Sequence, residues 1–319
     1  FVVDTRWDTV PEAAKRKAAQ CILDCVGVTL PGAVDPIRVP VIRYLAELGG
    51  RPDATVIGAG TKTSVTNAAF ANGVFGHVLD FDDTNQIFVG HGSVVIVAAI
   101  LALAERLGST GRDVLTAYVA GTEVQWRLGD ALVYCGNHYA KGWHSTGTVG
   151  SFGAAAAAGK LLGLDVAQLT HALGIAASEA AGFQEQFGTH GKAFHAGRAN
   201  ENGVTAALLA QGGFTSAKRA IEGPVGFAKL VADEYDLSKI AAYGQPWGIT
   251  DPTFARGINL KKYPVCASGL GAIEGMLELV AEHRIRPEDV AEIDCGVRPH
   301  SLNILMHHQA KTGLQAKFS

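Results

Sequence analysis

The chain has 319 residues, of which 48% are hydrophobic and 18% are charged. This length is sufficient for one large domain or two ordinary ones with a sizeable core, and the composition excludes disordered, collagen-like and coiled-coil proteins. The 27 basic and 30 acidic residues give a net charge of −3. The chain therefore lacks the basic excess of a general nucleic-acid-binding or membrane-surface protein, and we expect neither partner.

The cysteines and the apolar segments indicate the compartment. The five cysteines are an odd number, widely scattered and without a CxxC pair, which excludes zinc-finger and thioredoxin-like sites. We expect buried free thiols in a reducing compartment, the cytoplasm. The longest apolar run, residues 94–104, is shorter than the roughly 20 residues that a membrane-spanning helix needs. The first residues do not resemble a signal peptide.

The first three quarters of the chain predict a succession of helices. A Pro-Glu start at residues 11–12 and apolar residues at helical spacing predict a first helix that ends near Gly27, and residues 54–58 predict a short strand. In the helix predicted over residues 146–162, Gly and Ala recur at spacings of three and four, and this pattern predicts close contact with a neighbouring helix. Further helices are predicted over residues 67–79, 93–107, 113–133, 146–162, 165–181, 203–211 and 216–221.

The character of the sequence changes after about residue 243. A helix is predicted over residues 267–283, and the alternating apolar residues from Val290 to Val297 predict a strand. We therefore predict a mainly α protein. It combines a large all-helical domain over residues 1–255 with the beginning of a smaller α+β lid domain over residues 256–319.

An acidic run at residues 79–84 is the first candidate site. Three carboxylates in four residues, Asp80, Asp82 and Asp83, are costly beside an apolar helix unless they are solvated or used. Together with His91 they are a donor set that suits hard cations. The run also resembles the Asp-x-Asp-Asp proton donor of class II terpene cyclases. A helix end that enters a polar turn is the structural alternative.

Residues 142–148 open the Gly/Ala-rich helix with the order Gly-Trp-His-Ser-Thr-Gly-Thr. Hydroxyl and backbone N–H groups at a helix N-terminus form a natural anion site. The same residues also serve as ordinary helix caps. This segment therefore predicts either an anion site or a plain helix start.

Two segments gather cationic side chains. Residues 190–198 hold four cationic or titratable groups, and in a slightly acidic protein such a cluster suggests an anionic ligand. Lys192 and His195 are three apart and would share a helix face. Lys261 and Lys262 lie at the predicted domain junction, where clefts are favoured ligand sites. A basic surface turn and a basic hinge are the structural alternatives.

These segments, in this order, resemble the MmgE/PrpD family, which includes 2-methylcitrate dehydratases, cis-aconitate decarboxylases and iminodisuccinate epimerase. The family signature is a Leu-Asp-Phe-Asp-Asp-Thr run, a Gly-aromatic-His-x-Thr-Gly helix opening, a Lys-x-x-His-x-Gly-Arg-Ala segment and a Lys-x-(Tyr/Phe)-Pro segment. The resemblance covers essentially the whole chain. In this chain the four segments stand at residues 79–84, 142–147, 192–199 and 261–264.

The resemblance implies a helical domain with an α+β lid, assembled as a homodimer. It also implies chemistry without cofactor or metal on a small di- or tricarboxylate bound between the domains. The catalytic residues that it implies are Asp80, Thr84, His91, His144, Lys192 and Lys261. From the same cationic segments we expect three substrate-binding residues, namely His195, Arg198 and Lys262.

The chain departs from the family pattern in three ways. His91 is followed by Gly92 instead of the usual Pro. Leu270 stands where many members carry a second His, and this difference favours an epimerase over a dehydratase or decarboxylase. Family members are also longer, so we expect residues to be missing at both ends of this sequence.

The site residues suit the abstraction of a proton α to a carboxylate. Lys192 and Lys261 are suited to neutralise the developing enediolate charge. His91 or His144 would act as acid or base, with Asp80 orienting one of them. Return of the proton to the opposite face gives epimerisation, which we expect. Dehydration or decarboxylation is the alternative.

Two hypotheses from other classes stay open at this point. The first is a terpene-type cyclase that uses Asp82 as its proton donor, although an aromatic content of 8% argues against an aromatic-lined cavity. The second is a metabolite-binding protein without catalytic activity.

Overall fold

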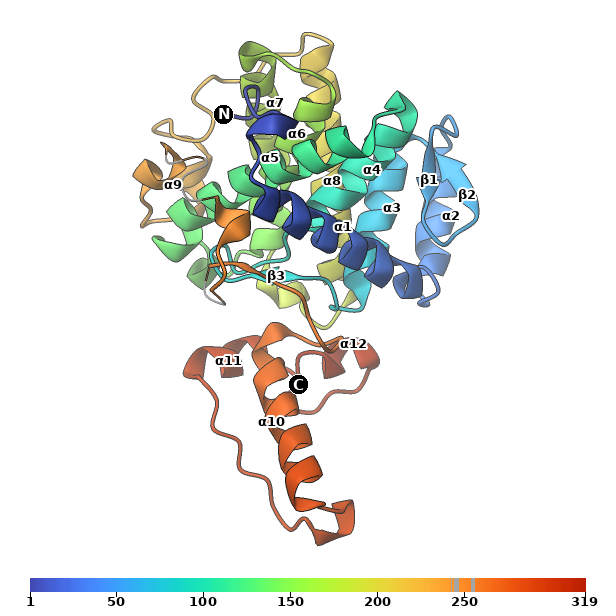
Figure 1. Cartoon of the computed structure of the whole chain (residues 1–319), viewed down its shortest axis with the longest axis vertical. Helices are drawn as coiled ribbons and strands as arrows, with labels where there is room; N and C mark the ends of the chain where they lie inside the picture. Colours follow the sequence, from blue (N-terminus) through green and yellow to red (C-terminus); the bar gives the residue numbers. More distant parts are fainter. Residues whose placement is uncertain (242, 244–246, 254–255) are drawn as a thin grey trace.

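The computed structural model of the chain describes residues 1–241, 243, 247–253 and 256–319. Helices dominate the described residues (Figure 1), so the predicted mainly α class is confirmed. β1 (Ala54–Val56) pairs antiparallel with β2 (Thr61–Thr63), and β3 (Thr84–Asn85) with β4 (Ile258–Asn259). The helices are α1 (Glu12–Gly32), α2 (Arg38–Leu48), α3 (Val65–Val78), α4 (Val94–Leu107), α5 (Gly111–Gly129), α6 (Ser145–Leu161), α7 (Val166–Glu179), α8 (His190–Gln211), α9 (Phe227–Val231), α10 (Ala267–His283), α11 (Pro299–Ile304) and α12 (Gly313–Ala316).

The helices α1–α9 form the helical body, residues 12–231, whose core is built around α4 and α6. Every residue from Val94 to Ile100 is buried, and so is every residue from Ser145 to Gly159. α6 packs against α4, α5, α7 and α8, and α8 packs in turn against α3. A helix that is apolar on all sides is stable only in such an interior position.

Close contacts between these helices depend on glycine. A Cβ atom at Gly150 of α6 would lie 2.9 Å from Val95 of α4. A Cβ atom at Gly203 of α8 would lie 2.3 Å from that of Ala154 on α6. Both distances are shorter than real contacts of a Cβ atom, so the backbones approach this closely only without a side chain. The close helix contact predicted for residues 146–162 is confirmed.

The first helix is longer than predicted. The predicted end near Gly27 is wrong, because α1 continues to Gly32. Its inner face, which includes Cys21 and Cys25, is buried. Glycine in a helix costs about 1 kcal/mol relative to Ala, and we infer that burial of this face outweighs that cost.

Two other predicted helix bounds differ from the structure. α8 begins at His190, capped by the Thr189 side chain, so the predicted start at residue 203 is too late. The helix predicted over residues 216–221 is wrong, because these residues form turns. Ser216 donates its backbone N–H and its hydroxyl to His171, 45 residues earlier on α7, so a contact with a distant segment takes the place of helical hydrogen bonds.

The C-terminal segment, residues 260–319, stands out from the helical body (Figure 1). The helix predicted over residues 267–283 is confirmed as α10. The strand predicted from Val290 to Val297 is wrong, because these residues form no strand. An alternating pattern supplies no backbone hydrogen bonds by itself, and no described strand lies beside this stretch to provide them. The predicted domain boundary at residue 255 lies outside the described residues.

A few contacts attach the C-terminal segment to the body. The Phe318 ring stacks on Phe187 with centroids 5.3 Å apart. His307 Nε2 lies 2.8 Å from the Phe187 carbonyl oxygen, and Lys317 Nζ donates to the carbonyl of Val78. The attachment is thus concentrated where α3 ends and α8 begins.

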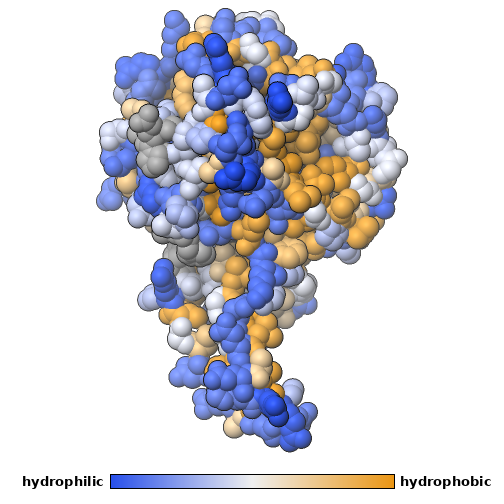
Figure 2. All heavy atoms as spheres, in the orientation of Figure 1, coloured by the Kyte–Doolittle hydropathy of each residue, from blue (hydrophilic) through white to orange (hydrophobic). Residues whose placement is uncertain are grey.

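The surface of the C-terminal segment carries exposed apolar side chains. Figure 2 shows apolar surface on the body and, between hydrophilic stretches, along this segment. Leu277, Leu279 and Ile293 are exposed there. No described helix combines the length and the hydropathy that a membrane crossing requires.

Candidate active site

A pocket of about 550 Å³ lies between the helical body and the C-terminal segment. Its volume falls within the range of about 300–1,000 Å³ that is usual for small-molecule sites. Its body wall includes five residues predicted from the sequence motifs: Asp80, Thr84, His91, His144 and Lys192. Its other wall comes from α10 and residues 293–304, including Ser268, Arg298 and Ser301.

The backbone beside the pocket adopts unusual conformations. Asp80 and Val89, near the two ends of the loop that joins α3 to α4, have φ angles of 52° and 46°. Non-glycine residues rarely occupy this left-handed region, and a β-branched residue there is strained. Such strain persists only where the surroundings hold it, and it is typical of functional sites. Here Lys261 Nζ holds the Asp80 carbonyl oxygen at 2.6 Å.

Two buried ammonium groups converge on the Asp80 carboxylate. Lys192 Nζ and Lys261 Nζ each donate to Asp80 Oδ1 at 3.0 Å. Burial favours a raised pKa for Asp80, but the two ammonium groups outweigh it and hold the pKa well below its ordinary value. Asp80 is therefore ionised. Its other oxygen, Oδ2, is buried without a hydrogen-bond partner in the described part of the chain.

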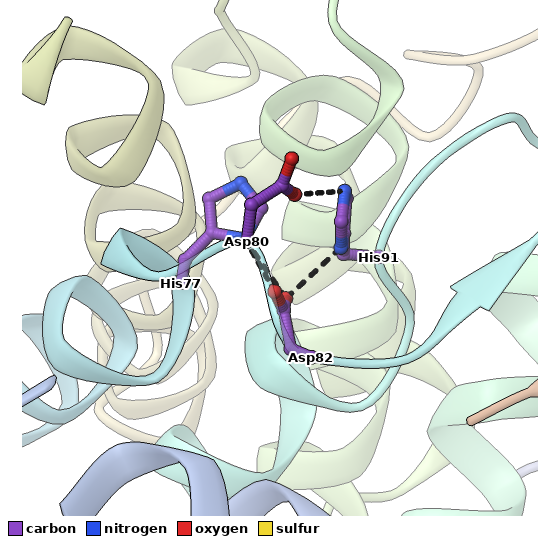
Figure 3. A group of neighbouring side chains, drawn as sticks. All are labelled: His77, Asp80, Asp82 and His91. Carbon is purple, nitrogen blue, oxygen red and sulfur yellow. Dashed lines mark hydrogen bonds and ion pairs between the residues drawn. The ribbon is translucent and has the colours of Figure 1, made fainter. Parts of the chain in front are cut away.

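His77 and Asp82 lie next to Asp80 in the same group of side chains (Figure 3). Lys192 Nζ lies 2.9 Å from His77 Nε2, and because an ammonium can only donate, His77 carries its hydrogen on Nδ1. That nitrogen lies 2.8 Å from Asp82 Oδ2 and donates to it. Burial lowers the pKa of His77 to about 3, although Asp82 opposes this. His77 is thus a neutral imidazole in one defined tautomer.

His91 reaches the same group from the other side of the loop (Figure 3). Its Nε2 lies 3.3 Å from both Lys192 Nζ and Asp80 Oδ1. Its Nδ1 lies 3.1 Å from Asp82 Oδ2, without the alignment of a full hydrogen bond. Burial lowers the pKa of His91. His91 therefore faces the pocket as a neutral ring that can exchange a proton.

The four side chains of Figure 3 also form a donor set of the kind that holds metal ions. Oxygen and nitrogen atoms of His77, Asp80, Asp82 and His91 lie within 4.8 Å of one another. The Lys192 ammonium, however, contacts three of these residues directly. A cationic group of the protein thus already makes the contacts that a metal ion would make.

A second pair of histidines forms another part of the pocket wall. His144 immediately precedes α6 and lines the pocket, and its Nδ1 lies 2.9 Å from Nδ1 of His195 on α8. Burial, reinforced by Lys192, holds the pKa of His144 well below its ordinary value. Burial, with His77 and Lys192, lowers the pKa of His195 to about 4. Both rings are neutral near pH 7.

The remaining predicted residues differ in position. Thr84 lines the pocket from β3, opposite Asn259 of β4. Lys261 is buried against Asp80 and is not among the residues that line the pocket. His195 does not line the pocket and is connected to it by its contact with His144. Arg198 pairs with Glu201 and Lys262 pairs with Glu274, both away from the pocket.

Several site residues are not among those predicted. His77 lies three residues before Asp80, and this helical spacing was a signal for it. The sequence motifs suggest Asp82 as a cyclase proton donor or as one member of a cation-binding set, but not as the partner of His77. Phe187 and Arg298 also line the pocket, but their place depends on contacts between distant segments, which no local sequence pattern indicates.

Comparisons with known proteins identify related sequences. The model of the MmgE/PrpD N-terminal domain matches residues 1–239. The cis-aconitate decarboxylase of Homo sapiens is 32% identical over 287 residues, which are 86% of this chain and 58% of the human protein. The Aspergillus terreus enzyme of the same name is 29% identical over 286 residues, which are 85% of this chain and 57% of the fungal protein.

A third relative, the cis-aconitate decarboxylase of Mus musculus, is 33% identical over 230 residues, 68% of this chain and 45% of the mouse protein. The chain thus spans only about half the length of the curated relatives that it matches.

Proposed function

Because the chain belongs to the MmgE/PrpD family, we propose that it carries the proton-transfer site of a lyase that decarboxylates a small, unsaturated tricarboxylate resembling cis-aconitate. Three relatives of known name are cis-aconitate decarboxylases, which supports the lyase alternative above the epimerase expected from Leu270. Leu270 lies on α10 but does not line the pocket, so its identity says little about the reaction.

One observation supports this proposal most directly. A buried ammonium, Lys192, lines the same pocket as two neutral imidazoles, His91 and His144. A cation is needed to hold an anionic substrate, and an imidazole can take or give a proton at the carbon next to a carboxylate. The carboxylates of a bound substrate would raise the pKa of both rings toward the working range.

The chemistry of decarboxylation fits these groups. In a β,γ-unsaturated carboxylate, the bond to the departing carboxylate breaks and its electron pair forms a new carbon–carbon double bond. The electron pair of the original double bond then takes a proton at the carbon α to a remaining carboxylate. Negative charge develops on that carboxylate as an enediolate, and we assign its stabilisation to Lys192. We assign proton delivery to His144 or His91, in either case from the imidazolium that the ring forms when the bound carboxylates raise its pKa and it takes up a proton from solvent.

The other predicted residues take supporting roles in this proposal. Lys261 and Asp80 hold Lys192 and the strained loop in place. We assign contact with a second carboxylate to Thr84 from the body and to Arg298 from the C-terminal segment, because both line the pocket. We assign no substrate contact to Arg198 and Lys262, because both pair with acidic residues outside the pocket.

The terpene-type cyclase finds no support in this site. Its proton donor would be Asp82, which must carry a proton to serve as an acid. Burial opposes ionisation, but His77 and His91 outweigh it and lower the pKa of Asp82 far below its ordinary value. Asp82 is also absent from the pocket lining.

Proton NMR in deuterated water tests the reaction directly. The full-length protein is incubated in turn with cis-aconitate, 2-methylcitrate and iminodisuccinate. We expect cis-aconitate to lose CO₂ and to gain one solvent deuterium α to a carboxylate. If deuterium enters iminodisuccinate without cleavage of a carbon–carbon bond, the protein is an epimerase. If only 2-methylcitrate reacts, by elimination of water, the protein is a dehydratase. Binding without any exchange would leave a metabolite-binding protein.

The assembly implied by the resemblance stays a proposal as well. We propose a cytoplasmic homodimer that works without a cofactor, with the C-terminal segment as part of a lid over the pocket. Light scattering coupled to size-exclusion chromatography gives the mass of the particle in solution. A monomer at working concentration would contradict the dimer.

A further inference from the structure

His144 and His195 face each other through identical atoms. Their Nδ1 atoms are 2.9 Å apart, and their ring centroids are 5.2 Å apart. Two N–H groups would repel at this distance, and two lone pairs would also repel. A hydrogen bond here needs exactly one hydrogen between the two nitrogens, so the state of one ring fixes the state of the other.

The surrounding chain holds both rings in this position. The His144 backbone N–H donates to the Gly182 carbonyl at 2.9 Å. A Cβ atom at Gly182 would lie 3.1 Å from the His195 ring, so the backbone there fits closely against it. Phe187 packs edge-on against His144 with centroids 4.9 Å apart, and Phe183 lies 6.0 Å from His195. The pair is thus set by rigid elements.

The charge of Lys192 and the position of the pocket favour His144 as the ring that donates. The Nε2 atom of His144 lies on the opposite side of the ring from Nδ1, and His144 lines the same pocket wall as Lys192. A nearby ammonium favours a lone pair over an N–H group on the nitrogens that face it. His195 does not line the pocket. The hydrogen of His144 therefore belongs on Nδ1, where it is donated to His195.

We propose that His195 is a positioning residue that fixes His144 in the tautomer with hydrogen on Nδ1 and a free lone pair at Nε2 facing the pocket. His195 accepts the N–H of His144 at Nδ1 and carries its own hydrogen on Nε2. When His144 Nε2 takes a proton, the bond to His195 stabilises the imidazolium that forms. The tautomer rests on the geometry, while its use in turnover rests on the proposed function.

Three substitutions of His195 distinguish the loss of its hydrogen bond to His144 from the loss of the space that its ring fills. In His195→Asn the amide oxygen stands where Nδ1 stands in His, so it can still accept from His144. In His195→Gln the amide group corresponds to Nε2, which points elsewhere. His195→Leu fills much of the space without any acceptor. Circular dichroism and thermal unfolding of each variant identify those that fold.

Nitrogen-15 NMR of labelled histidine reports the tautomer of His144, assigned by its loss in His144→Gln. We expect a protonated Nδ1 and a bare Nε2 in the wild type and in His195→Asn, and a mixture of tautomers in His195→Gln and His195→Leu. A wild-type His144 that carries its hydrogen on Nε2 would overturn the proposal. An unchanged tautomer in both folded variants that lack the acceptor would do the same.

Steady-state kinetics of the same variants test whether the contact between His144 and His195 takes part in the reaction. We expect kcat to fall by about 10- to 100-fold in His195→Leu with little change in KM, and to recover largely in His195→Asn. If no carboxylate is turned over by the wild type while the tautomer responds as expected, the proposed function fails and the tautomer assignment stands. If turnover in His195→Leu equals that of the wild type, His195 has no part in catalysis.

Discussion

The two walls of the pocket are built in opposite ways. On the body wall, Lys192, Asp80 and His91 are buried, and each contacts charged or polar groups at 3.3 Å or less. On the other wall, α10 has no buried residue and Arg298 is exposed. The body wall is therefore ordered before any ligand arrives, whereas the C-terminal wall gains little from its own packing.

The two walls therefore differ in how firmly they hold the groups that could stabilise charge. Groups that stabilise charge in a transition state work best when they are preorganised in a water-excluded site, and the body wall provides that. The described part of the C-terminal wall has few such contacts, so it adds little to this preorganisation. Changes at the body wall should therefore affect both chemistry and stability, while equal changes on the exposed faces of α10 should affect neither strongly.

The largest effect is expected from Lys192→Met. The change keeps the length of the side chain but removes the ammonium, so His77 and His91 lose their donor and Asp80 keeps only Lys261. We expect turnover to fall by about 10²- to 10³-fold, as for the loss of one preorganised charge-stabilising group. We expect stability to fall by about 3 kcal/mol, since breaking a buried ion pair is costly.

Steady-state kinetics and urea unfolding measure the two effects of this variant. Lys62→Met is the matched control, because Lys62 pairs with Glu105 at the surface with half of its side chain exposed. Its loss should cost no more than about 1 kcal/mol. Equal stability losses in the two variants would contradict a preorganised body wall.

The second prediction concerns the stability that the protein loses at acid pH because His138 is buried. Its side chain is fully buried with Nε2 3.0 Å from Thr148 Oγ1, and burial lowers its pKa from 6.5 to about 4. The unfolded chain takes up this proton below pH 6.5, but the folded chain does so only near pH 4. The stability contribution is therefore present above pH 6.5 and is lost as the pH falls toward 4, by about 3 kcal/mol.

Urea unfolding between pH 7 and pH 4 checks this prediction in His138→Gln. The Gln amide can keep the bond to Thr148 without titrating, so the variant should lose about 3 kcal/mol less than the wild type over this range. His283→Gln at the end of α10 is the control, since its side chain is exposed in the folded and unfolded chains alike. A parallel loss in the wild type and His138→Gln would show that His138 is not responsible.

Local signals explain which parts of this fold could be predicted from sequence. The helix predicted over residues 267–283 has the bounds of α10, and the one predicted over residues 165–181 differs from α7 by only one or two residues at each end, because caps and helical spacing act within a few residues. The strand from Val290 to Val297 failed, because a strand exists only with a partner, which periodicity cannot supply. The early end of α1 at Gly27 failed because tertiary packing outweighs the local preference of glycine.

The site shows the same difference between what local motifs predict and what depends on contacts between distant segments. The motifs predicted that Asp80, His91, His144 and Lys192 belong together, and all four line one pocket. The motifs could not predict that Lys261 lies behind Asp80, out of the pocket lining. That arrangement joins residues that are 181 positions apart, and only packing decides it.

A smaller effect is expected from Gly203→Ala in the body. The new Cβ atom would lie 2.3 Å from that of Ala154 and 2.6 Å from the backbone of α6, so α6 and α8 must separate. We expect a loss of about 1–3 kcal/mol, the usual cost of overpacking a core, partly offset by the better helix propensity of Ala. Urea unfolding gives the value. A variant as stable as the wild type would mean that these helices yield easily.

The smallest effect is expected from Gly269→Ala, the matching change on α10. No atom lies within 4 Å of the added Cβ position, and Gly269 does not line the pocket. The only remaining terms are helix propensity and the entropy of the unfolded chain, so stability should be unchanged or rise by up to about 1 kcal/mol. Thermal unfolding at two protein concentrations measures it. A loss as large as that of Gly203→Ala would mean that α10 is packed against another surface in solution. The contrast between an ordered body wall and a weakly packed C-terminal wall would then apply only to the isolated chain.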